Sequence, residues 1–145
     1  MVAFAEVLDY LREIYPRSSD FNIDRAMLTL YLIDWKAAID LRRPVTDLEW
    51  RIEHVPQPTV AQREVMLSAL QHEPTCALAG NMGEMTAEDR AIIHDIVARV
   101  GSKSKTELLR LVYSTFPVLS QPRHAPINLV SMADKYKREY RDGIS

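Results

Sequence analysis

The sequence predicts an α+β fold that is predominantly α, with about six helices and a small two- or three-stranded antiparallel sheet. Over most of the chain, apolar residues recur at three- and four-residue steps, the period of an amphipathic helix. Residue types that cap helices stand directly before several of these runs. One short segment instead alternates apolar and charged residues, as a half-buried strand does.

Length and composition indicate one globular domain over residues 1–145, because 47% hydrophobic and 26% charged residues are near globular averages. No secretory signal opens the chain, and the longest apolar stretch, 26–41, carries Asp34 and Lys36, so we expect no membrane segment. The single cysteine, Cys76, suits a cytoplasmic protein. A net charge of -2 offers no broad positive field to attract phosphates, which disfavours nucleic acid as a partner.

The first two helices are predicted from apolar periodicity and from their ends. Apolar residues share one face over residues 2–15, and Pro16 ends that helix. Asn22 is a candidate N-cap for a second helix over residues 23–42. This helix has two apolar stripes, so it should be the buried central helix. Asp34 falls on one stripe and therefore needs a partner or a proton.

A strand is predicted over residues 48–53, where three apolar residues alternate with three charged ones. The segment 55–58 ends this strand because its two prolines have no N–H to donate. Residues 75–79 are a candidate second strand paired with the first. A sheet this small should have a free edge, to which a partner strand could be added.

Capping residues predict two helices in the middle of the chain. Thr59 begins a capping box for a helix that runs to about residue 71. Thr86 caps the clearest helix, and Gly101 is its expected C′ residue. Glu88 and Asp89, in the first turn of that helix, are expected to be surface acids favoured by the helix dipole.

Two further helices complete the chain. Ser104 and Glu107 form a capping box for a helix that Pro117 keeps from continuing far past Phe116. A proline-rich loop over 121–126 then leads into a final helix. The residues on the apolar side of that helix are Leu129, Ala133, Tyr136 and Tyr140.

Two groups of short motifs follow one another along the chain. The first is Tyr31-Leu32-Ile33-Asp34-Trp35-Lys36, followed by Arg43-Pro44-Val45-Thr46. The second is Met85-Thr86-Ala87-Glu88-Asp89, continuing through Gly101 to Thr106-Glu107-Leu108. Their order and spacing resemble the Panacea domain, also called the SocA-like antitoxin family, over roughly residues 20–118. One departure is Val55-Pro56-Gln57-Pro58, where family members usually carry Gly-Pro.

The resemblance implies an antitoxin of a bacterial or prophage toxin-antitoxin system that binds a cognate toxin protein and blocks it. It does not name the toxin, because the toxins of this family are of diverse kinds. A DNA-binding or transcription-associated regulator, and a protease adaptor for a toxic partner, remain alternatives. The oligomeric state is open between a homo-oligomer and a hetero-oligomer with the toxin.

Five residues are interpreted as structural, and seven as candidates for protein binding. We expect Asp34 to brace the turn over residues 43–50, with a binding role as the alternative. The other structural candidates are Thr86, Gly101, Ser104 and Glu107. Interfaces favour aromatic and arginine anchors inside a polar rim, and the predicted strand should expose such a region. The candidate protein-binding residues are Trp35, Lys36, Glu49, Trp50, Arg51, His54 and Pro56.

No catalytic, metal or cofactor site is predicted, so we expect a protein that is not an enzyme. His72 and Cys76 are the only pair with ligand-like spacing, and Pro74 breaks the helix that would align them. The sequence has no phosphate-binding glycine loop and no nucleophile elbow. The basic run 135–141 is interpreted as a solvated helix face, with a surface for an acidic partner or, weakly, nucleic acid as the alternative.

Overall fold

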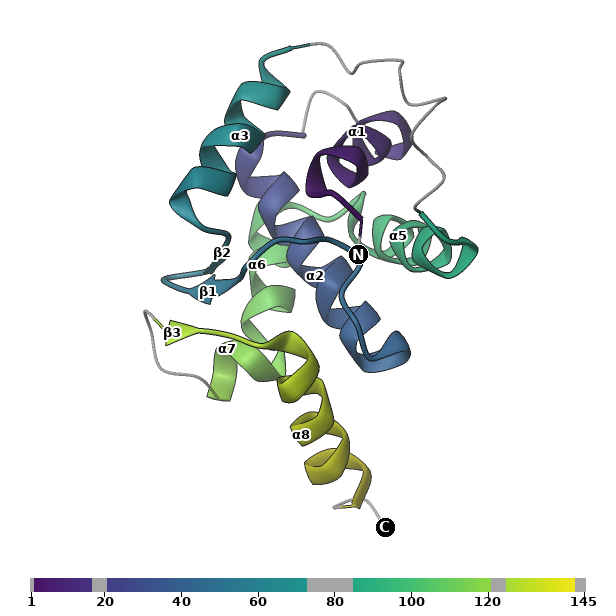
Figure 1. Ribbon diagram of the computed structural model, residues 1–145, viewed down its shortest axis with the longest axis vertical. Coiled ribbons are helices and arrows are strands. Elements are labelled where there is room, and N and C mark those ends of the chain that lie inside the picture. Colours follow the sequence, from purple (N-terminus) through teal and green to yellow (C-terminus); the bar gives the residue numbers. More distant parts are fainter. Residues whose placement is uncertain (1, 17–20, 73–84, 121–124, 143–145) are drawn as a thin grey trace.

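The computed structural model describes residues 2–16, 21–72, 85–120 and 125–142. Within these ranges the chain forms seven helices and one three-stranded sheet, which confirms the predicted, predominantly helical α+β class (Figure 1). The helices are α1 (Phe4–Ile14), α2 (Ile23–Leu41), α3 (Val60–Leu70), α5 (Ala87–Val100), α6 (Lys105–Tyr113), α7 (Phe116–Ser120) and α8 (Leu129–Asp142). The strands are β1 (Arg51–Ile52), β2 (Pro56–Gln57) and β3 (Ala125–Pro126).

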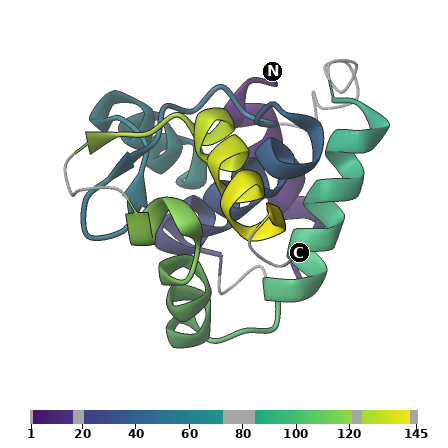
Figure 2. The same cartoon turned by 90° about the horizontal axis from the view of Figure 1, so that it is seen from below.

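Helix α2 is the buried centre of the fold, as its two apolar stripes predict. Its residues 25–35 are all buried, and α5, α6 and α8 pack against it. The side chain of Asn22 accepts a hydrogen bond from the Arg25 N–H at 2.9 Å, which confirms the predicted N-cap. The sheet and α5 lie on opposite sides of the molecule (Figure 1 and Figure 2). Helix α2 therefore links the two sides.

Helix α1 is capped by a residue far away in the sequence. Its own N-cap position, Ala3, has no side chain that can accept a hydrogen bond, and Asp47 Oδ1 accepts from the Phe4 N–H at 2.9 Å instead. Val2 forms a parallel bridge with Thr46. The Val2 N–H donates to the Val45 carbonyl at 2.8 Å, and the Val2 carbonyl accepts from the Asp47 N–H at 3.1 Å. The start of α1 is thus fixed to the turn that follows α2.

The sheet differs from the prediction in its partners. Strand β1 is central and pairs antiparallel with β2 on one side and with β3 on the other. The first strand does end before residue 55, as predicted, but Pro56 and Gln57 then form an outer strand of the same sheet, where a proline nitrogen need not donate to the ladder. Pro126 occupies the other outer strand. The predicted strand 75–79 lies outside the described residues.

The capping predictions for the later helices hold. Thr59, Thr86 and Ser104 each accept a hydrogen bond from the backbone N–H three residues on, and the side chain of that residue accepts one from the backbone N–H of the cap. The backbone N–H of Ser104 donates to Glu107 and lowers the pKa of that carboxyl. Helix α6 ends at Tyr113 and so does not continue past Phe116, as predicted, and Pro117 stands in the first turn of the separate helix α7, where its missing N–H has no role.

Gly101 is required for a different reason than predicted. It occupies the C-cap of α5 with φ -59° and ψ -30°, which is right-handed backbone that any residue can adopt. A Cβ at this position would lie 2.7 Å from the Val97 carbonyl oxygen and 2.8 Å from Pro16 Cγ. Glycine is therefore needed because the Val97 carbonyl oxygen and the ring of Pro16 both lie too close to this position for a side chain.

Arg25 is a buried cation that closes the same helix end. Its Nε donates to the Tyr15 hydroxyl at 2.7 Å, and one terminal nitrogen donates to the carbonyls of Val100 at 2.9 Å and Lys103 at 2.5 Å. Carbonyl groups at the end of a helix carry partial negative charge and otherwise lack donors. Arg25 thereby fixes the first turns of α2 to the end of α5.

We expect Gly101→Ala to lower the free energy of unfolding by about 1–3 kcal/mol, as overpacking in a well-packed core does. Urea unfolding of the wild type and the variant measures the change. The control is the same substitution in a Pro16→Ala background, where the ring contact is gone and the effect should shrink. An equal effect in both backgrounds would show that Pro16 does not set the requirement for glycine.

Candidate protein-binding cleft

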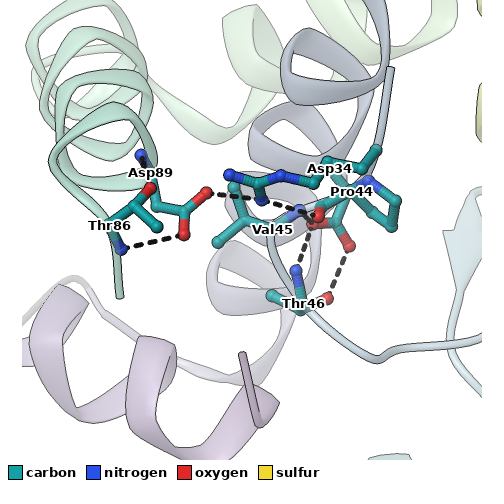
Figure 3. A network of polar contacts seen from close by, with 7 residues as sticks. Asp34, Pro44, Val45, Thr46, Thr86 and Asp89 are labelled. Carbon is teal, nitrogen blue, oxygen red and sulfur yellow. Dashed lines mark hydrogen bonds and ion pairs between the residues drawn. The ribbon is translucent and has the colours of Figure 1, made fainter. Parts of the chain in front are cut away.

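The buried carboxylate of Asp34 holds the turn that follows α2. Its Oδ1 accepts hydrogen bonds from the backbone N–H groups of Val45 at 3.0 Å and Thr46 at 2.9 Å (Figure 3). Its Oδ2 accepts from the Thr46 hydroxyl at 2.5 Å and from Trp50 Nε1 at 2.8 Å. Asp34 is fully buried, so these four donors replace water around it. The predicted brace of the 43–50 turn is confirmed.

Burial raises the pKa of Asp34 from its ordinary value to about 6, because the charged form loses its hydration. The hydrogen bonds from Thr46, Trp50 and Val45 act in the opposite direction, because they favour the carboxylate. At neutral pH the group is therefore ionised, and all four donors face a negative charge.

The same turn has a second anchor on α5. Arg43 donates to Asp89 Oδ1 at 2.8 Å, and Asp89 Oδ2 accepts from the Thr86 backbone N–H at 3.1 Å (Figure 3). Asp89 thus caps α5 and binds Arg43 at once. Its expected position on the surface was wrong, since only 1% of Asp89 is exposed, whereas Glu88 beside it is exposed as predicted. Asp89 is buried because it pairs with the guanidinium of Arg43, and the helix pattern alone does not predict this long-range partner.

Three of the predicted binding residues are buried, so the expectation that they are exposed was wrong. Trp50 is 3% exposed, because its indole N–H reaches Asp34 and its ring packs edge-on against Tyr31. Trp35 is 7% exposed and packs against the ring of Tyr136 on α8. Pro56 is buried in β2. These three side chains therefore lie beneath the molecular surface.

The other four candidates remain accessible, in two separate places. Glu49, Arg51 and His54 are exposed in and around β1. Lys36 is half-buried and forms ion pairs with acidic residues of α2 and α5, at the side of the molecule away from the sheet. The structure therefore brings Glu49, Arg51 and His54 together and leaves Lys36 out of the group.

An open cleft of about 600 Å³ lies beside Glu49 and Arg51. One wall is the chain from Pro44 to Arg51, and the other is the segment that enters α8. The two walls are joined where the Ile127 N–H donates to the Trp50 carbonyl at 3.0 Å. The lining residues are Pro44, Leu48, Glu49, Trp50, Arg51, Thr59, Pro126, Ile127, Asn128, Leu129 and Val130.

Sequence reasoning missed the second wall of this cleft. Residues 126–130 lie about 75 positions from β1 in the chain, and long-range contacts bring them there: the β1–β3 pairing, the hydrogen bond from Ile127 to Trp50 and the packing of α8 on α2. The predicted proline-rich loop gave no sign of this pairing, because prolines argue against strands. An apolar run that begins at Ile127 beside a capping residue, Asn128, was the available signal for a helix start in this place.

Comparisons with protein-family models, with curated proteins and with solved structures found no match for this chain. The resemblance to the Panacea family therefore stays a prediction that depends on the motifs. No helix in the described ranges is long and apolar enough to span a bilayer. No cluster of three or more histidine, cysteine, aspartate or glutamate side chains in those ranges could hold a metal ion. Cys76, of the pair considered for metal binding, lies outside them.

We expect Asp34→Asn to lower the free energy of unfolding by about 2–4 kcal/mol at neutral pH. An amide offers one acceptor oxygen and an NH₂ group to a site built from four donors, so at least one buried donor loses its acceptor. Urea unfolding measures the effect, and Asp40→Asn, on the exposed face of the same helix, is the matched control. A loss no larger than that of Asp40→Asn would contradict the brace.

The destabilisation by Asp34→Asn should also depend on pH. The folded-state pKa of about 6 lies above the ordinary 3.8, so between these values the folded protein binds a proton more tightly than the unfolded chain. This contribution to stability is complete below about pH 4 and disappears as the pH rises through 6. The variant cannot titrate there, so its deficit should be about 1–3 kcal/mol larger at pH 4 than at pH 7. A deficit that grows with pH would mean that the hydrogen bonds outweigh burial.

Proposed function

We propose that this protein is an antitoxin of a bacterial or prophage toxin-antitoxin system and neutralises a cognate toxin by direct, stoichiometric binding in the cytoplasm. The observation that carries the proposal is the convergence of the Panacea-like motifs on one network (Figure 3). Asp34, the 43–46 turn and the Thr86–Asp89 helix start are far apart in the sequence and are joined by hydrogen bonds. Motifs that lie together in the structure identify a family more specifically than the same motifs taken one by one. This supports the resemblance to the Panacea family.

The cleft beside this network supports a binding function. Its floor is apolar and includes the buried side chains of Leu48 and Leu129, while Glu49 and Arg51 stand exposed on its rim. An apolar centre within a polar or charged rim is the usual composition of a protein interface. Because the network fixes the 44–51 wall, little conformational entropy would be lost on binding.

The test uses the reading frame next to this gene. Expressed alone, its product should stop growth, and co-expression of this chain should restore growth. The two purified proteins should form a stable complex of defined stoichiometry, measured by size-exclusion chromatography with light scattering. A neighbouring product that is harmless, or that neither binds this chain nor is neutralised by it, would overturn the proposal.

A further inference from the structure

The sheet edges are poor places for a partner to bind, contrary to the expectation of strand addition. Both outer strands are two residues long, and each contains a proline, Pro56 in β2 and Pro126 in β3. A proline in an outer strand removes a donor that an added strand would use. A partner near β1 is therefore recognised by side chains rather than by backbone pairing.

The cleft offers such a side-chain site. Its volume of about 600 Å³ falls in the range of roughly 300–1,000 Å³ that encloses a small ligand or a few protruding side chains. Leu48, Leu129 and Trp50 on its floor are each buried, and Ile127 and Val130 on its second wall are half-buried. This lining favours an apolar side chain that enters from outside.

Two side chains of opposite charge, Glu49 and Arg51, lie on the rim of the cleft. Glu49 and Arg51 are two positions apart in an extended segment, so their side chains leave the same face at a spacing of about 7 Å. Trp50 between them faces the core. Arg51 forms an ion pair of 3.8 Å with Glu53, and 47% of its side chain is exposed, so a carboxylate of a partner can approach it from solvent. The rim thus presents one negative and one positive charge in a fixed order.

We propose that this cleft is the toxin-binding site and that it accepts a large apolar side chain of the toxin flanked by a basic and an acidic residue. The basic residue pairs with Glu49 and the acidic residue with Arg51, so the order of charges sets the orientation of the toxin. The apolar side chain enters between Leu48, Ile127 and Val130. This inference rests on the proposed antitoxin function and specifies the surface that performs it.

The test measures binding of the purified neighbouring gene product to variants of the full chain by surface plasmon resonance. Glu49→Arg and Arg51→Glu should each weaken the complex by about tenfold or more and slow association. The double variant, with both reversals, restores the net charge but inverts the order, so its binding should stay weak. Val130→Trp, which fills the cleft, should weaken binding by at least about thirtyfold, as loss of a central anchor does.

Matched controls make the same charge changes elsewhere. Glu64→Arg on the exposed face of α3 and Arg99→Glu on α5 lie outside the cleft lining and should bind like the wild type. Circular dichroism and thermal unfolding verify that each variant is folded. Should Val130→Trp fail to fold, a photo-cross-linking benzoylphenylalanine at Glu49, compared with one at Glu64, reports the same contact: only the residue at 49 should cross-link to the toxin.

The outcomes separate the two proposals. Wild-type binding and neutralisation that survive every cleft variant, with no cross-link at 49, would overturn the cleft assignment and leave the antitoxin function standing. A wild-type chain that binds no neighbouring product would overturn both. A chain that is dimeric on its own, and becomes monomeric with the Glu49→Arg substitution, would make the cleft a surface between two copies and overturn its assignment to the toxin.

Discussion

The carboxylate of Asp34 must receive all its hydrogen bonds from protein groups, because α2 is buried on all sides at that point and water cannot reach it. Its four donors come from residues 45–50, which must therefore fold back across α2. The positions of other elements follow from this one requirement. The turn that supplies the donors also pairs with Val2, caps α1 through Asp47, and reaches α5 through Arg43.

Two buried charges on α2 are satisfied in the same manner. Asp34 is surrounded by N–H and O–H donors, and Arg25 by carbonyl and hydroxyl acceptors, so neither is held by an opposite charge within these contacts. Neutral dipoles that are fixed by the fold stabilise an ion without the second desolvation that a buried ion pair requires. Each charge also binds a different distant segment, so α2 is fixed along its length to the 45–50 turn and to the end of α5.

The local part of this structure could be predicted from the sequence, and the long-range part could not. Asn22, Thr59, Thr86 and Ser104 cap the helices that follow them because a cap depends only on residues within one turn. That Asp34 needs donors followed from its place on an apolar stripe. The identity of the donors, the burial of Trp50 and the second wall of the cleft depend on tertiary contacts, which a periodic pattern does not encode. The two outer strands were not predicted, because each contains a proline, which argues against a strand although an outer strand tolerates it.

The prolines of β2 and β3 have a consequence for the protein at high concentration. Fibrils of the cross-β type grow when unpaired strand edges of successive molecules stack, and a proline in such an edge interrupts the stacking. Both edges of this sheet are interrupted in this way. Self-association of the folded chain would then have to use side chains. The large apolar side chains exposed among the described residues are Val60 at 78% and Val65 at 51% on α3, Leu119 at 69% on α7 and Tyr113 at 42% on α6. Precipitation at high concentration should accordingly respond to polar replacements at these positions and be insensitive to changes along the sheet edges.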